Sequence, residues 1–373
     1  MTVTHPDPDP VLIRLRAVHR AMGELRRGAT VLLDSPDGRA VLLAAEMAGA
    51  DGLRAFAALA DGPAALLLTG MRAAAITGIA APDGPVAFAT GALLTPAVLR
   101  GVADPTADQL LAEPLVPRPT PAAAPAAMAL IKLARVLPAV LFAPSRVADL
   151  ARVADPAGPE PLVVTAADVL TYAETSAGAL VRVAEAAVPL ASAPNTRIIA
   201  FRAPDAGIEH LAIVIGDPAA VDAPLVRVHS ECFTGDLLGS LRCDCGPQLH
   251  LALERIGTAG AGVVLYLSQE GRGIGLVNKL RAYALQDRGF DTLDANRALG
   301  WYADERNFMI AATMLRDLGL PRIRLMSNNP AKVAALQACG IEIVAIEPLR
   351  TAPNGTNDAY LATKARRFGH TLG

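Results

Sequence analysis

The chain has 373 residues, of which 52% are hydrophobic and 19% are charged, with a formal net charge of −2. This composition is typical of a folded protein of about two domains, and it excludes a disordered chain. The near-neutral charge argues against a nucleic-acid binder, which usually has a basic excess. No stretch of about 20 residues is apolar enough to cross a membrane. The opening MTVTHPDPDP lacks the layout of a signal peptide, so we expect a cytoplasmic protein without a membrane partner.

The first half predicts short strands alternating with alanine-rich helices. Apolar residues recur at helical spacing after residue 11, and short apolar runs flank a Ser-Pro-Asp-Gly turn. The expected segments are a helix from Leu12 to Leu25, strands at Thr30–Leu33 and Ala40–Ala45, a proline-rich connector at Glu113–Ala127 and a helix at Ala166–Val188. This half is predicted to be an α+β domain spanning residues 1–194.

A second domain is predicted from residue 195 to 373, after a boundary at Pro189–Asn195. Its expected strands are Arg197–Arg202, Leu211–Ile215, Leu225–His229, Gly262–Leu267 and Ile323–Met326. Its expected helices are Gln248–Ile256, Leu276–Arg288, Asp304–Leu318 and Ala331–Ala338. Several helices directly follow a strand, which predicts an α/β domain with a mixed sheet.

Three of the four cysteines lie within fourteen residues, as Cys232, Cys243 and Cys245. Such clustering does not favour a disulfide framework, which would spread cysteines along the chain. Thiolates are strong zinc ligands, and three protein ligands with one open position are typical of a catalytic zinc site. The sequence therefore predicts that these three residues bind zinc, and that Cys339, among apolar neighbours, is a structural thiol.

The segment His229-Ser230-Glu231 matches the His-x-Glu half of the zinc deaminase signature. The second half of that signature, Pro-Cys-x-x-Cys, is absent, because the chain reads Cys-Asp-Cys-Gly-Pro instead. A deaminase is therefore excluded, and His229 is expected to contact substrate or to pack in the core.

A glycine-rich loop, SQEGRGIGL, follows the strand candidate that ends at Leu267. Its glycines allow the backbone to approach a ligand closely, and Arg272 offers a planar donor for phosphate. The spacing is neither that of a P-loop nor that of a dinucleotide fingerprint. Taken singly, this loop can be a turn, and Asp304-Glu305-Arg306 can be a helix start with a capping carboxylate.

Together these segments resemble GTP cyclohydrolase II, the enzyme at the start of riboflavin synthesis. The motifs VHSECFTGD, SLRCDCG, QEGRGIGL, NKLRAYALQD, ADERNF and SNNPAK occur in the family's order between about Asn195 and His370. The resemblance implies an α/β catalytic domain, one catalytic Zn²⁺ per subunit, Mg²⁺ with the triphosphate, and a homodimer. It implies hydrolysis of GTP to 2,5-diamino-6-(5-phosphoribosylamino)pyrimidin-4-one, formate and diphosphate.

The resemblance also implies roles for individual residues. Arg306 would be the nucleophile on the α-phosphorus, Asp304 the proton acceptor, and Tyr283 a helper in the chemistry at C8 of guanine. The positions that match GTP contacts are Arg227, Val228, His229, Ser230, Glu231, Gln248, Glu270, Gly271, Arg272, Thr292, Ser327 and Lys332. Ser327 stands where many relatives have threonine, and Trp301-Tyr302 departs from the usual pattern before Ala303.

The N-terminal half resembles 3,4-dihydroxy-2-butanone 4-phosphate synthase at its beginning and its end. The acidic run of that family is replaced by LLDSPDGRAVLL, and there is no histidine between Ala21 and Ala200. We therefore expect a degenerate domain without synthase activity. Two other functions remain open for the chain: a nucleotide hydrolase that leaves the formyl group attached, and a catalytically silent nucleotide-binding or regulatory protein.

Overall fold

The computed structural model describes residues 9–91, 95–147, 161–205, 208–352, 355–356 and 367. The chain divides into two compact units. The first comprises Met1–Tyr172 and Val277–Asp304, and the second comprises Ala173–Leu276 and Glu305–Gly373. These units do not coincide with the predicted halves, because a segment from the middle of the second half belongs to the first unit.

The first unit is built on a seven-stranded sheet with the strand order β5-β4-β3-β6-β2-β1-β7. Its strands are β1 (Val31–Ser35), β2 (Gly38–Ala44), β3 (Ala65–Thr69), β4 (Pro85–Ala89), β5 (Pro117–Arg118), β6 (Ala139–Pro144) and β7 (Leu162–Thr165). Every pair is antiparallel except β1 with β7. The predicted α+β class is therefore confirmed for this unit.

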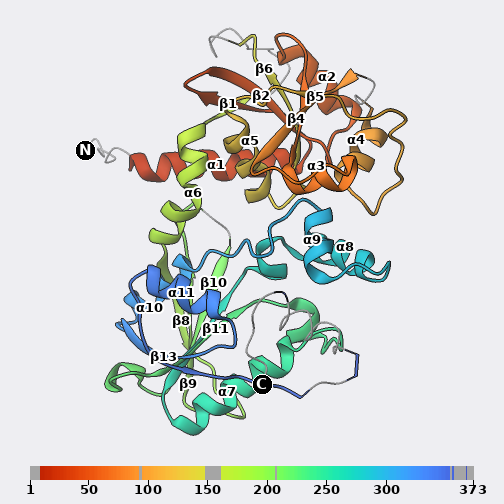
Figure 1. The fold of residues 1–373 in the computed structure, drawn as a ribbon. Helices are drawn as coiled ribbons and strands as arrows, with labels where there is room; N and C mark the ends of the chain where they lie inside the picture. Colours follow the sequence, from red (N-terminus) through yellow and green to blue (C-terminus); the bar gives the residue numbers. More distant parts are fainter. Residues whose placement is uncertain are drawn as a thin grey trace, which may run out of the picture. The chain divides into compact units, whose positions relative to one another are not determined.

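The helices of the first unit are α1 (Pro10–Arg26), α2 (Ala50–Leu59), α3 (Gly70–Thr77), α4 (Pro96–Ala103), α5 (Ala124–Leu133), the first part of α6 (Ala166–Gly178), α8 (Leu276–Gln286) and α9 (Thr292–Ala298). Of these, α1, α2, α3 and α5 pack against the sheet, and α9 contacts α3. Figure 1 shows α1 and α5 lying together beside the strands. The predicted connector at Glu113–Ala127 is wrong in part. It contains β5 and the start of α5, where Pro125 is tolerated because the first helical turn needs no donor there.

Segment 277–304 joins the first unit through buried polar contacts. The guanidinium of Arg72 donates to the carbonyl oxygens of Val102 (2.8 Å) and Gly101 (3.2 Å), and also to that of Ala298 (3.0 Å). Arg281 forms an ion pair with the carboxylate of Glu46, which belongs to residues 1–172, at a distance of 2.7 Å. Burial lowers the pKa of Arg72 to about 10, so the side chain is still cationic at neutral pH.

The substitution Arg72→Met is expected to destabilise the protein by about 3–5 kcal/mol, because it leaves three buried carbonyl groups without their donor. Chemical denaturation followed by circular dichroism measures this change. Arg54→Met is the matched control, since Arg54 is exposed and pairs only with Asp51 of the same helix. Equal stability of the two variants would contradict the structural role of Arg72.

The second unit contains a mixed seven-stranded sheet with the order β14-β13-β11-β12-β10-β9-β8. Its strands are β8 (Val181–Ala187), β9 (Thr196–Arg202), β10 (Glu209–Ile215), β11 (Leu225–Ser230), β12 (Gly262–Leu267), β13 (Arg322–Met326) and β14 (Glu342–Glu347). The four strands β14, β13, β11 and β12 are parallel, and the others are antiparallel. The predicted mixed-sheet α/β class is confirmed.

Three longer helices cover this sheet: α7 (Cys245–Ala259), α10 (Met309–Asp317) and α11 (Pro330–Ala338). The faces of α10 and α11 pack on Val226, Leu265 and Ile323, which are fully buried in the main apolar cluster. Ile256 of α7 packs on Val264 in a second cluster. The central parallel strands β11 and β12 are thus buried on both sides, which explains the continuous apolar sequence of β12.

Two predicted helices are shorter in the structure. The helix expected at Ala166–Val188 ends at Gly178, and the residues after it form β8, the edge strand of the second sheet. The helix expected at Asp304–Leu318 begins only at Met309. The backbone of Asn307 exchanges hydrogen bonds with the side chain of Gln269 (2.8 and 3.0 Å), which holds this stretch out of the helix. Within the described residues, the structure contains no helix that is long and apolar enough to cross a membrane.

Candidate metal centre and active site

The predicted site residues of the second unit gather at one edge of its sheet. Strands β11, β12 and β13 are parallel neighbours, so their carboxyl ends point in the same direction. Ser230 ends β11, Glu270 follows β12, and Ser327 follows β13. Ligands of open α/β sheets bind at this edge, where loops from neighbouring parallel strands meet.

The three clustered cysteines converge next to this edge. Cys232 follows β11, and Cys243 and Cys245 lie at the start of α7. Their sulfur atoms all lie within 4.8 Å of one another, and the sulfurs of Cys232 and Cys243 are 3.8 Å apart. Two thiolates that bind a tetrahedral zinc at 2.3 Å are also about 3.8 Å apart. The donor set and its spacing therefore fit a zinc ion.

The close approach of these sulfurs makes a bound cation favourable once the thiols are ionised. The hydrogen bond between Cys232 and Cys243 is the largest cause that raises the pKa of the Cys243 thiol above its ordinary value. A thiolate is the form that binds metal, and a divalent cation among three sulfurs offsets the repulsion between thiolates. The backbone N–H of Gly235 donates to the Cys232 sulfur (3.3 Å), which stabilises negative charge there.

Gly235 is required by the close approach of the sulfurs. A Cβ atom at this position would lie 2.8 Å from the sulfur of Cys243 and 3.0 Å from that of Cys232. Gly235→Ala is therefore expected to displace the thiolates and to weaken zinc binding by about 10- to 100-fold, as other changes around a metal site do. Competition with a zinc-sensitive dye measures the affinity. The control is Gly239→Ala, since a Cβ at Gly239 meets no atom within 4 Å, although its φ of +63° adds some strain. Equal zinc affinity of the Gly235→Ala and wild-type proteins would contradict this packing.

Asp236 organises the loop that carries Cys232. Its carboxylate accepts hydrogen bonds from the backbone N–H of Cys232 (3.0 Å) and from the hydroxyl of Tyr266 (3.0 Å). His229 Nε2 lies 3.1 Å from both carboxylate oxygens, and its ring stacks on Tyr266. Burial is the largest cause that lowers the pKa of His229, which favours the neutral imidazole with Nε2–H as the donor. Burial likewise raises the pKa of Tyr266, which keeps its hydroxyl protonated.

His229 is therefore held by Asp236 and is not among the metal-binding groups. Its Nδ1 atom is buried, and in the described structure it has no hydrogen-bond partner. A buried nitrogen without a partner is costly, so this atom is a candidate to accept a hydrogen bond from a bound ligand or water. This position agrees with the expectation that His229 contacts substrate or packs in the core.

Arg227 and Gln248 connect the sheet to the start of α7. Arg227 donates to the side-chain oxygen of Gln248 (2.7 Å), and Gln248 donates to the carboxylate of Asp244 (2.6 Å). Asp244 lies between two of the cysteines. Burial lowers the pKa of Arg227 to about 10, while Cys245 and Asp244 oppose this shift. This buried chain of polar groups holds the residues that flank the cysteine cluster.

The glycine-rich loop forms a short 3-10 turn, Glu270–Gly273, and not a continuous entry into α8. Gly271 and Arg272 both have positive φ angles (63° and 62°), which is uncommon for an arginine. Glu270 accepts a hydrogen bond from the backbone N–H of Phe233 (2.6 Å), so this turn is tied to the cysteine loop. The predicted phosphate loop and the predicted metal loop are thus neighbours.

Arg306 and Lys332 lie beside the ends of β11 and β13. Arg306 approaches the hydroxyl of Ser230 (3.5 Å), and its guanidinium lies 5.0 Å from the ring centroid of Phe308. Lys332, which is 4% exposed, donates to the carbonyl oxygen of Val228 (2.7 Å). The edge of the sheet therefore carries two cations, an arrangement suited to a phosphate-bearing ligand.

Three further predicted residues belong to the first unit. Tyr283 lies on α8, with the Lys279 ammonium 5.7 Å from its ring centroid. Thr292 begins α9 and accepts a hydrogen bond from Gln286 (3.4 Å). Asp304 is exposed at the end of segment 277–304, and the expectation that it caps a helix is wrong because α10 starts five residues later.

Asp236, Tyr266 and Gly235 were not among the site residues predicted from the sequence. Asp236 had a detectable signal, because it is an acidic residue four positions after a predicted ligand. Tyr266 lies within an apolar strand, and only the parallel register that pairs it with His229 reveals its role.

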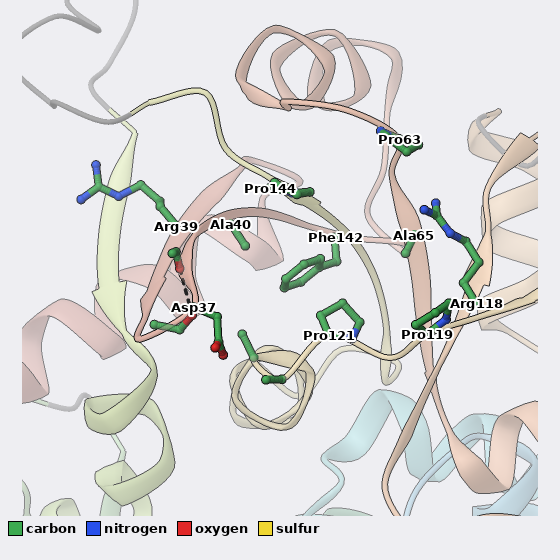
Figure 2. Close-up of a pocket in the computed structure, with 14 residues that line it drawn as sticks. Asp37, Arg39, Ala40, Pro63, Ala65, Arg118, Pro119, Pro121, Phe142 and Pro144 are labelled. Atoms are coloured by element: carbon green, nitrogen blue, oxygen red, sulfur yellow. Dashed lines mark hydrogen bonds between the residues drawn. The ribbon is translucent and has the colours of Figure 1, made fainter.

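The first unit contains a cavity of about 400 Å³ near the β1–β2 hairpin. Figure 2 shows Phe142 and Pro121 at its centre, with Asp37 and Arg118 on opposite sides. Asp37 is the one carboxylate among its described lining residues, and none of them is a histidine. The cavity therefore lacks a carboxylate cluster for Mg²⁺ and a histidine for proton transfer.

The chain is similar to several known proteins. The family model described as GTP cyclohydrolase II matches residues 181–348. GTP cyclohydrolase-2 of Haemophilus influenzae (strain PittGG) is 52% identical over 177 residues, which cover 47% of this chain and 82% of that protein. Riboflavin biosynthesis protein RibBA of Bacillus cereus (strain AH187) is 56% identical over 164 residues, which cover 44% of this chain and 41% of that protein.

Among solved structures, RibBX, a two domain 3,4-dihydroxy-2-butanone 4-phosphate synthase from A. baumannii, is similar over 90% of this chain and 99% of that chain. Its sequence identity is 20% and its TM-score is 0.34, a similarity too low to support an argument. GTP cyclohydrolase-2 of Azospirillum brasilense is 46% identical over 366 residues, which cover 95% of this chain and 94% of that protein. Since this similarity extends through both units, the chain belongs to the GTP cyclohydrolase II family.

Proposed function

We propose that this protein is a zinc-dependent GTP cyclohydrolase II that converts GTP to 2,5-diamino-6-(5-phosphoribosylamino)pyrimidin-4-one, formate and diphosphate. The observation that carries the proposal is the cluster of Cys232, Cys243 and Cys245 at the carboxyl edge of three parallel strands. The overall reaction consumes water at two places: the bond to the β-phosphate is hydrolysed, and C8 of the guanine ring leaves as formate.

The cysteines would hold Zn²⁺, which, when bound, lowers the pKa of a coordinated water and so supplies hydroxide at neutral pH. Gly235 and Asp236 keep the cysteine loop in the geometry that the ion requires. His229 would offer its buried Nδ1 to a donor of the substrate, because Nε2–H is already engaged by Asp236.

Cations would bind the triphosphate. Arg272, Arg306 and Lys332 are suited to phosphate oxygens, and Mg²⁺ would accompany the substrate to offset its remaining charge. The remaining GTP contacts would come from backbone and side-chain groups of nine further residues. These are Arg227, Val228, Ser230, Glu231, Gln248, Glu270, Gly271, Thr292 and Ser327.

Arg306 would attack the α-phosphorus, which breaks the bond to the β-phosphate and releases diphosphate. Water would then hydrolyse the resulting N–P bond, so that the product keeps its 5′-phosphate and Arg306 is restored. An arginine is normally cationic and therefore a poor nucleophile, so the step requires a proton acceptor. Asp304, two residues earlier in the chain, would take that proton. Tyr283 would assist the attack of water at C8.

The N-terminal half, residues 1–194, would be a degenerate relative of 3,4-dihydroxy-2-butanone 4-phosphate synthase, and residues 195–373 the catalytic domain. The replaced acidic run and the absence of histidine between Ala21 and Ala200 support loss of synthase activity. We also propose a homodimer. Turnover of ribulose 5-phosphate by the purified protein would disprove the loss of synthase activity.

Product analysis after incubation of the zinc-loaded protein with GTP and Mg²⁺ tests the main proposal. Formate, diphosphate and the diaminopyrimidine should appear in equal amounts, and a chelator should stop their formation. Diphosphate with a retained formyl group would instead indicate the other hydrolase. Zinc binding without turnover would leave a nucleotide-binding or regulatory protein.

A further inference from the structure

The first unit contains a second and larger cavity, of about 550 Å³, that no proposed step of the reaction uses. It lies between α3, the loop before β4, and α9 with the residues that follow it. Figure 1 shows α3 and α9 as neighbours, and the two helices are in contact. All its lining residues belong to the first unit, so the cavity is complete within one compact part of the chain.

Two aromatic rings line this cavity and are unusually exposed. Phe290 is 43% exposed and Tyr302 is 52% exposed. The Lys132 ammonium lies 4.0 Å from the ring centroid of Tyr302, which holds that ring in place through a cation–π contact. Large exposed aromatic side chains around a hollow mark binding sites, because stacking on them is favourable for any flat ring.

The polar groups of the cavity select the kind of ring. Asp83 and Asp294 contribute two carboxylates and Arg297 one guanidinium, so the lining carries one net negative charge. Arg297 lies 3.7 Å from Asp294, which leaves Asp83 at the other side as an exposed acceptor. This charge disfavours phosphates and favours a ligand with N–H donors.

The walls of the cavity are preformed. The backbone N–H of Gly70 donates to the carbonyl oxygen of Gly84 (2.9 Å), which fixes the loop carrying Asp83 against the start of α3. Asp291 caps α9 through its hydrogen bond to the N–H of Asp294 (2.8 Å). Preformed walls reduce the ordering cost of binding.

We propose that this cavity binds an uncharged, planar nitrogen heterocycle between Phe290 and Tyr302, with Asp83 accepting a hydrogen bond from a ring N–H. The volume is in the range of small-molecule sites. The ligand class differs from the substrate, because a triphosphate would meet the negative lining. The proposal concerns binding only and is independent of GTP turnover.

Riboflavin is the probe, since its flavin ring is planar, uncharged and fluorescent, and its fluorescence is quenched by stacking on aromatic rings. The full-length protein is titrated into riboflavin in the presence of a saturating GTP analogue with a methylene group between the α- and β-phosphorus. Saturable quenching is expected. Riboflavin 5′-phosphate, which has the same ring and two negative charges, should bind more weakly than riboflavin.

Three variants locate the site. Tyr302→Ala and Asp83→Asn should each weaken binding, the first by about tenfold or more, as loss of a stacking ring does. Ala74→Leu, on the α3 wall, should block binding by filling the cavity. Asp61→Asn is the matched control, because Asp61 is an exposed carboxylate of the same unit outside the cavity. Melting temperatures confirm that each variant is folded.

Several results would overturn the proposal: no saturable quenching, displacement of riboflavin by the GTP analogue, tighter binding of the phosphate, or equal affinity in the folded Tyr302→Ala and Ala74→Leu variants.

Discussion

Replacement of Cys243 by serine is expected to remove bound zinc and to lower formate release by at least about 100-fold. A serine hydroxyl is a much weaker zinc ligand than a thiolate, and even changes to the residues that support metal ligands cost about 10- to 100-fold. The three sulfurs lie within 4.8 Å of one another, so loss of one leaves only two ligands. Metal analysis by mass spectrometry and a formate assay on the same preparation measure both effects.

The matched control is Cys339→Ser. Cys339 follows α11 and packs partly buried against the main apolar cluster of the second unit. This variant should keep its zinc and its activity, with a small loss of stability. Ring opening by Cys243→Ser at the wild-type rate would refute the assignment of Cys243 as a metal ligand.

The substitution Arg306→Ala is expected to reduce diphosphate release by about 10²- to 10³-fold, the usual effect of removing a charged group from a reacting centre. The structure places this guanidinium beside Ser230 at the edge of the sheet, next to the predicted phosphate loop. Zinc content should be unchanged, because Arg306 is not one of the three sulfur ligands. Single-turnover measurement of diphosphate separates this step from formate release.

Arg306→Lys distinguishes a nucleophile from a simple cation. Lysine keeps the positive charge but loses the guanidinium, so activity near wild type would favour electrostatic binding over attack by Arg306. Arg255→Ala is the control, since Arg255 is exposed and, among the described residues, donates to the carbonyl oxygen of Pro348. Normal diphosphate release by Arg306→Ala would exclude both roles.

Local patterns in the sequence were sufficient to predict most strands and helices of the second half of the chain. Strands β9 to β13 and helices α7, α8 and α11 occur within a few residues of their predicted positions. The start of α7, for example, lies three residues earlier than expected. Their apolar periodicity is a local property, and burial on the sheet follows from it. Strand β14 was not predicted; its apolar run is only four residues long between two glutamates, and most of its residues are exposed at a sheet edge.

The sequence by itself determined the thiol cluster, because Cys232, Cys243 and Cys245 are close in the chain and their ligand chemistry does not depend on a partner from elsewhere. Only the tertiary structure decided which residues meet around them. The parallel pairing of β11 with β12 and β13 brings Ser230, Glu270 and Ser327 to one edge, although up to 97 positions separate them. The tertiary structure also decided that segment 277–304 packs in the first unit, where Arg72 donates a hydrogen bond to the carbonyl oxygen of Ala298. Such contacts depend on strand order and on buried hydrogen bonds between distant residues, and neither is encoded in a local pattern.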